Sequence, residues 1–178
     1  MDLTTRVLLK VTPAATKAID FSKTASATPE LSISETLADG TGLDEADQVY
    51  HSAGTLGADA DVDIDLSGSL TDVFGDTVTF ARIKMILFEN TSTNASTLQF
   101  GGGDGQVGTN AWDTWIGANS TVNPGSEYVK IPKGGALALF APDATAWTVT
   151  AGTGDILTIK ELSSVAAAYS IVIVGATA

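Results

Sequence analysis

The sequence has no cysteine, one histidine and few basic residues, and each scarcity removes a class of function. Without cysteine, the chain can form no disulfide, no thiolate metal site and no cysteine nucleophile. Its 178 residues include 9 Lys and Arg against 21 Asp and Glu, which gives a net charge of −12. Because nucleic-acid binding depends on clustered basic side chains that neutralise phosphates, we expect no nucleic-acid partner.

Long apolar runs are also missing. The apolar run at 165–174 is interrupted by Tyr169 and Ser170, and it is far shorter than the roughly 20 residues that span a bilayer. The run at 7–9 is too short for a secretory signal, which needs about 7 to 15 apolar residues. We therefore expect neither a membrane partner nor a signal segment.

The acidic residues are concentrated in one part of the chain. Between Lys23 and Arg82 there are twelve Asp and Glu and no Lys or Arg, so this stretch accounts for the whole net charge. A solvated, self-repelling surface is one interpretation, and a surface that docks on a cationic partner or collects divalent cations is the other. Charged residues are nevertheless only 17% of the chain, against about 25% in a typical domain. Such a surface predicts an oligomer or a larger assembly.

Turn-forming residues separate short apolar stretches from Gln48 onward, and no apolar period of 3.6 residues is long enough for a buried helix. One short amphipathic helix, at 43–48, is the only helical candidate. The sequence therefore predicts an all-β fold, a β-sandwich of jelly-roll type. Strands are expected at 59–66, 77–88, 97–100, 126–131, 136–140, 147–150, 156–160 and 169–174.

The first thirty residues differ from the rest because they are small and polar and lack a sustained period. We predict that residues 1–30 form an extended N-terminal arm, with a short strand around 7–11, and that residues 31–178 form the β-sandwich domain.

Four aspartates, Asp59, Asp61, Asp63 and Asp65, alternate with apolar residues and indicate a strand with its carboxylates on one face. Several oxygen ligands are what calcium prefers, so these residues are weak metal candidates. Adjacent carboxylates on one strand lie about 7 Å apart, which is too far for them to hold one ion without help from a second strand. A solvated or cross-strand-paired face is the alternative.

Other features of the calcium-loop pattern do not fit. Leu66 occupies the position at which an EF-hand loop needs glycine, and Asp72 stands where the bidentate glutamate belongs. If the strand at 77–88 pairs with the aspartate strand, Arg82 and Lys84 would instead face some of the carboxylates.

No catalytic or cofactor site is predicted. A G-x-G-x-x-G pattern at Gly103, Gly105 and Gly108 follows an expected strand, but no helix follows it to hold a phosphate. His51 is the only histidine, and there is no G-x-S-x-G motif for a serine nucleophile. We expect that the protein is not an enzyme and needs no cofactor.

Trp112 and Trp115, with Asp104 and Asn110 nearby, form a candidate glycan-binding platform. An aromatic face can stack on a sugar while acids and amides bind its hydroxyls. Packing of the same rings in the core or at a subunit interface is the alternative.

Strand and turn motifs in five segments resemble small structural proteins of tailed bacteriophages. The segments are 64–80, 83–91, 132–139 with its PKGG turn, 147–159 and 169–175. The resemblance implies a non-enzymatic virion component, a capsid decoration or cement protein built on a β-sandwich. Its implied partners are further copies of itself, with a trimer as our expectation, and the major capsid protein. A carbohydrate-binding host-attachment module of a tail or fibre is the alternative.

Overall fold

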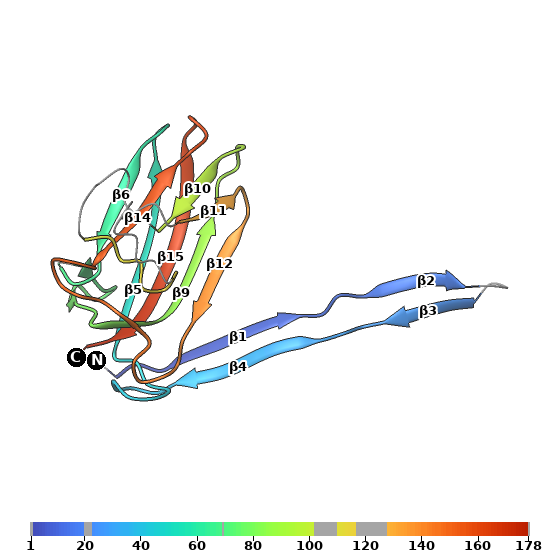
Figure 1. Ribbon diagram of the computed structural model, residues 1–178, viewed down its shortest axis with the longest axis horizontal. Coiled ribbons are helices and arrows are strands. Elements are labelled where there is room, and N and C mark those ends of the chain that lie inside the picture. Colours follow the sequence, from blue (N-terminus) through green and yellow to red (C-terminus); the bar gives the residue numbers. More distant parts are fainter. Residues whose placement is uncertain (1, 20–22, 69, 102–109, 117–127, 178) are drawn as a thin grey trace.

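The computed structural model describes residues 2–19, 23–68, 70–101, 110–116 and 128–177. A five-stranded and a four-stranded antiparallel sheet pack against each other, and a long two-stranded hairpin projects from one end of them (Figure 1). The described residues contain no helix, which confirms the all-β prediction. The short helix considered at 43–48 is absent, because Leu43 and Asp44 form a turn in which Asp44 has a φ of 54°, Glu45 bridges to Ala38, and a strand begins at Gln48. No described helix is therefore available to cross a membrane.

Each sheet combines strands from distant parts of the sequence. Sheet I has the order β12 (Ala136–Phe140), β9 (Arg82–Asn90), β15 (Ala167–Ala176) and β5 (Gln48–Leu56), and β13 (Trp147–Thr148) also pairs with β9. Sheet II has the order β11 (Val129–Pro132), β10 (Thr97–Phe100), β14 (Ile156–Glu161) and β6 (Asp61–Asp65). A small hairpin of β7 (Leu70–Thr71) and β8 (Thr77–Val78) lies between β6 and β9 in the chain.

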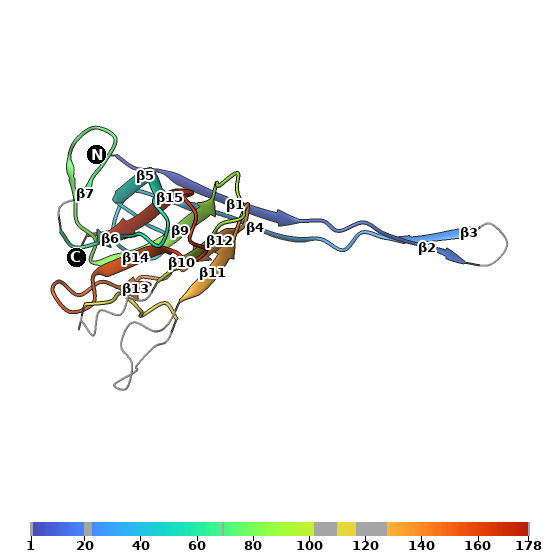
Figure 2. The same ribbon diagram turned by 90° about the horizontal axis from the view of Figure 1, so that it is seen from above.

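The chain crosses repeatedly between the sheets. It goes from β5 to β6, from β6 to β9 and from β9 to β10, and later from β11 to β12 and from β14 to β15. Figure 2 shows the two layers from above. Strands that follow each other in sequence therefore seldom pair, and most pairing joins distant segments.

Alternating apolar side chains fill the space between the sheets. A row of aromatic rings crosses this core. Phe88 of sheet I lies 6.2 Å from Tyr169 and 4.8 Å from Phe100 of sheet II, measured between ring centroids. Trp115 lies 5.6 Å beyond Phe100, and Trp112 lies 6.2 Å beyond Trp115. Ring pairs at such distances add to the stabilisation that comes from burial alone.

A buried carboxylate closes one end of sheet II. Glu161, at the end of β14, accepts backbone N–H hydrogen bonds from Asp59 at 3.2 Å, Ser163 at 2.6 Å and Val165 at 3.3 Å. Burial by itself raises the pKa of Glu161, but the surrounding backbone N–H donors outweigh it and hold the pKa below its usual value. The ionised side chain thus joins the turn before β6 to the turn after β14.

The hairpin is formed by the first four strands. β1 (Thr5–Val11) pairs with β4 (Leu31–Leu37), and further out β2 (Ala15–Ile19) pairs with β3 (Lys23–Ala27). The boundary expected at residue 30 therefore falls inside this hairpin, just before its returning strand.

Two prolines explain why the hairpin ladder is divided. Val11 pairs with Leu31 and Ala15 pairs with Ala27, so the same register places Pro13 opposite Pro29. Proline has no backbone N–H to donate, and the ladder is interrupted in both strands at one level.

Candidate functional site

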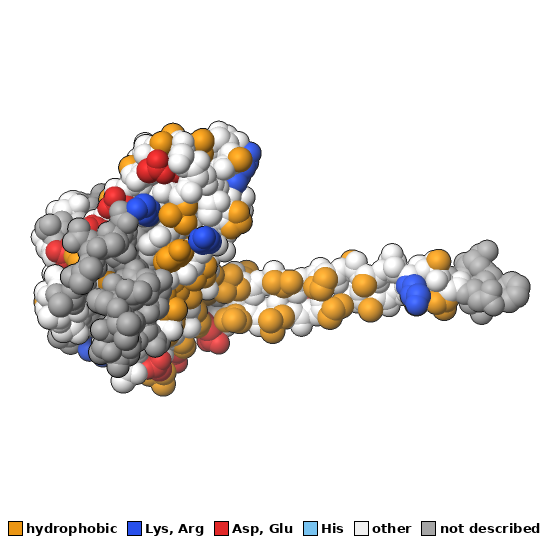
Figure 3. Space-filling model, turned by 45° about the horizontal axis from the view of Figure 1, so that its top comes forward, with side chains coloured by type: hydrophobic (Ala, Val, Ile, Leu, Met, Phe, Trp, Pro, Cys, Tyr) orange, Lys and Arg blue, Asp and Glu red, His pale blue; other side chains and the backbone are white. Residues whose placement is uncertain are grey.

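One face of the hairpin is apolar and becomes progressively exposed away from the sheets. Cross-strand pairing places Thr5 and the exposed Glu35 on this face together with the following apolar residues: Val7, Leu9, Val11, Leu31, Ile33 and Leu37. Leu37 is 0% exposed and Val7 is 2% exposed, whereas Leu9 and Ile33 reach 37% and 40%, and Val11 and Leu31 reach 62% and 71%. Figure 3 shows the hydrophobic side chains along the projecting hairpin.

The buried end of this face packs on the outer face of sheet I. A small cluster contains Leu37 and Ala46 together with Val174 of β15, and Leu3, Val49, Met85, Phe140 and Val172 pack against it. Met85 pairs with Phe140 and with Val174, and Val174 pairs with Val49, so four of these side chains form one cross-strand row. We call it the covered row.

Lys84 fixes the loop that follows the hairpin. Its buried Nζ donates hydrogen bonds to the carbonyl oxygens of Gly42, at 2.9 Å, and of Asp143. Desolvation lowers the pKa of Lys84, although the nearby Asp143 carboxylate opposes this shift. Lys84 therefore connects β9 to the loop that follows β4 and to the loop that follows β12.

The outer face of sheet I continues beyond the covered row, where no described residue covers it. The next row contains Ala138, Leu87, Val172 and His51, and the one after it contains Ala136, Glu89, Ser170 and Ala53. We call these two the open rows. Leu87 is 41% exposed, and the open rows contain a single carboxylate, that of Glu89.

The alternating aspartates lie on β6 and in the turn before it, but they do not face the predicted cations. β6 pairs with β14, so Asp61 lies opposite Lys160 and Asp63 lies opposite Thr158, whose hydroxyl donates to Asp63 at 2.6 Å. Arg82 and Lys84 belong to β9 in the other sheet. The expectation that they face the aspartates is therefore wrong, because the strand that follows in sequence is not the neighbour in space.

The outer aspartates are accounted for separately. Asp59 accepts a hydrogen bond from Ser164 at 3.0 Å, and Asp65 accepts one from the backbone of Ser67 at 3.1 Å. Within the described residues, no three His, Asp or Glu side chains gather closely enough to hold a metal ion.

The two tryptophans of the predicted glycan platform lie against the core. Trp112 is fully buried, and its indole N–H donates to the carbonyl oxygen of Thr148 at 2.9 Å. Trp115 is half-buried and donates to the carbonyl oxygen of Trp112 at 3.3 Å. Trp112 thus has no free ring face for a sugar in this structure. Asn110 is half-buried beside them, and Asp104 lies outside the described residues.

The remaining predicted features can be placed briefly. His51 is exposed on β5, which is an edge strand of sheet I. The glycines of the G-x-G-x-x-G pattern, Gly103, Gly105 and Gly108, lie outside the described residues.

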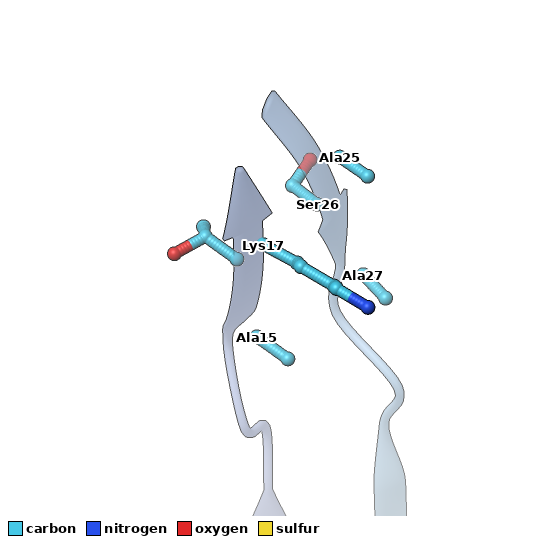
Figure 4. A pocket seen from close by; sticks show the side chains of 6 residues that line it. Ala15, Lys17, Ala25, Ser26 and Ala27 are labelled. Carbon is cyan, nitrogen blue, oxygen red and sulfur yellow. The ribbon is translucent and has the colours of Figure 1, made fainter. Parts of the chain in front are cut away.

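A shallow hollow of about 200 Å³ lies between β2 and β3 and is lined by Ala15, Thr16, Lys17, Ala25, Ser26 and Ala27. In Figure 4 the Lys17 side chain extends from β2 across this hollow toward β3. The small side chains around it make the outer part of the hairpin thin. A hollow of this kind has neither the depth nor the converging polar groups of a small-molecule site.

Sequence reasoning did not find the apolar hairpin face. Its signal lies in two segments, 7–11 and 31–37, in which every second residue except Glu35 is apolar, although Leu8 interrupts the alternation in the first segment. Only their pairing across more than twenty residues turns these two short patterns into one surface. No family model, curated protein or solved structure matches the chain.

Proposed function

We propose that this protein is a non-enzymatic structural component of a bacteriophage virion, a capsid decoration protein that assembles through its hairpin and its apolar sheet surface. The single observation that carries the proposal is the exposed apolar face of the hairpin. An isolated two-stranded hairpin is at best marginally stable in water, and this one leaves large apolar side chains uncovered along its length. Such a segment is suited to insertion against neighbouring subunits.

The proposed architecture is a jelly-roll sandwich with an N-terminal arm. Three features support it: two packed sheets of five and four strands, antiparallel pairing of their strands, and a chain that alternates between the sheets. The arm of this proposal is the β1–β4 hairpin. Jelly rolls are common in viral capsid proteins and in lectins, so the fold class is compatible with a virion location and does not by itself establish it.

The virion assignment rests on the resemblance described above together with the assembly surface. The chain carries a net charge of −12, which would keep free copies apart in solution until apolar surfaces bring them together. The proposed partners are other copies of the chain and the major capsid protein. The alternative glycan-binding function has less support, because the ring of Trp112 is enclosed by the core.

Co-sedimentation with capsids tests this proposal. Purified protein is mixed with capsids of the encoding phage that were assembled without it, and the pelleted protein is counted per capsid. A fixed, saturable number of copies per capsid is expected. Protein that stays in the supernatant at all concentrations, or that is retained on a glycan array instead, would overturn the decoration assignment.

A further inference from the structure

We infer that the exposed apolar face of the hairpin docks on the open rows of sheet I in a second copy of the chain. This inference rests on the proposed assembly function and names the partner. The structure offers two exposed apolar surfaces, and four properties of these surfaces fit them to each other.

The first reason is that the two kinds of surface already pack together within one chain. The buried end of the hairpin face, at Leu37, lies on the covered row of sheet I. The open rows continue the same sheet face directly beyond it, through Leu87, Val172 and Ala138. The exposed part of the hairpin continues the same hairpin face. The intermolecular contact therefore extends an existing apolar contact.

The second reason is periodicity. Leu9 lies opposite Ile33, and Val11 lies opposite Leu31, so the exposed hairpin face has two rows of large side chains. Successive rows on one face of a strand are about 7 Å apart. The open part of sheet I also has two rows with that spacing, and one of them consists largely of small side chains into which larger ones can fit.

The third reason is charge. Residues 1–37 contain four acids and four bases, so the entire net charge of −12 belongs to residues 38–178. Two sheet bodies brought together directly would place carboxylates against carboxylates. The hairpin has no net charge and its apolar face carries one carboxylate, that of Glu35, while Glu89 is the only carboxylate of the open rows, so this contact brings fewer like charges together.

The fourth reason is geometry. The hairpin runs away from its own sheets (Figures 1 and 2), so it does not cover its own open rows. Each copy then donates one hairpin and receives one. Such an exchange closes either as a two-fold dimer or as a ring of several copies.

Engineered disulfides test this contact, and the absence of native cysteine keeps the background clean. The hairpin variant Val11→Cys is co-expressed with a tagged sheet variant, Ala53→Cys, Ala136→Cys or Ala138→Cys, so that only a bond between copies gives the mixed product. The matched control replaces Val11→Cys by Leu8→Cys, because Leu8 is equally exposed but lies on the opposite hairpin face.

We expect at least one sheet position to give severalfold more mixed disulfide with Val11→Cys than with Leu8→Cys. Equal yields from both hairpin positions, or no mixed disulfide with any of the three sheet positions, would overturn the inference. The outcome is separable from the capsid test. Capsid loading without the disulfide refutes this contact alone, and the disulfide without capsid loading refutes the decoration assignment alone.

Discussion

Leu37 of β4 and Val174 of β15 are buried in one cluster, although 136 positions separate them in the sequence. Leu37 is the last residue of the hairpin, and Val174 lies on the outer face of sheet I. This contact anchors the hairpin at its base. The apolar face beyond it is thereby held in solvent, available to a neighbour.

Replacing Leu37 by alanine should loosen this anchor. Removal of a buried leucine side chain costs about 2 to 5 kcal/mol, and here the loss falls on the joint between hairpin and sheet. Compared with the wild type, Leu37→Ala should show faster amide hydrogen exchange over residues 6–11 and a smaller change over β15. The exposed Leu8→Ala change should shift stability by less than about 0.5 kcal/mol. Unchanged exchange in the hairpin of Leu37→Ala would show that the cluster is not its anchor.

Glu161→Gln tests the buried carboxylate. A glutamine amide presents an N–H₂ group toward backbone donors that now bind a carboxylate oxygen, so one or more hydrogen bonds are lost. We expect a loss of about 1 to 3 kcal/mol in urea unfolding at neutral pH. Glu89→Gln, a change at an exposed carboxylate of β9, is the control and should be nearly neutral.

The same residue predicts a dependence on pH. The pKa of Glu161 is lower in the folded chain than in the unfolded one, so its stabilisation is present above the unfolded pKa and is lost as the pH falls through the folded pKa. The stability difference between the wild type and Glu161→Gln should therefore shrink on acidification. A difference that stays constant from neutral to acid pH would contradict this.

Gly175 is required for a close approach of two strands. It lies at an irregularity of β15, where an added Cβ would be 2.4 Å from the carbonyl oxygen of Arg82 and 2.7 Å from the Phe80 ring. Gly175→Ala should cost about 1 to 3 kcal/mol through overpacking. At Gly57 the nearest atom to an added Cβ is 3.9 Å away, so Gly57→Ala should be close to neutral. Equal melting temperatures for both variants would refute the packing argument.

How far the sequence predicts the fold depends on the range of the contacts. Local patterns in the residues themselves predict the alternation in 59–66 and the exact bounds of β10 and β12. They also predict the absence of helices from the part of the chain that the structure describes. They do not predict the outer hairpin, because Ala15 and Ala27 carry no apolar period. Its strands are defined by pairing with each other, across a segment that the sequence alone presents as irregular.

Strand neighbours were also beyond local reasoning. The expectation that Arg82 and Lys84 face the aspartates is wrong, because their strand β9 comes after β6 in the sequence but belongs to the other sheet. The expected single strand at 77–88 is divided into β8 and β9, because the chain crosses between the sheets around Phe80.

Composition predicts that Trp112 belongs either to a binding surface or to a core. Only its three-dimensional neighbours decide between them.

Trp112→Ala separates folding from binding. Because this ring is fully buried, its removal should cost about 3 to 5 kcal/mol, and circular dichroism melting should show a large drop. Trp115→Ala, at a half-buried ring, should cost less. A Trp112→Ala protein with wild-type melting would place that ring on the surface, contrary to the structure.

The most direct test of the account is the mass of the protein in solution, measured by sedimentation velocity at several concentrations. We expect the wild type to form a discrete oligomer. The combined variant Leu9→Thr, Val11→Thr, Leu31→Thr and Ile33→Thr should sediment as a single folded chain. The control is Val73→Ser with Phe74→Ser, which removes two apolar side chains elsewhere that are at least as exposed and should leave the oligomer intact. A wild type that is a single chain at all concentrations, or a hairpin variant that keeps the oligomer, would contradict the central claim.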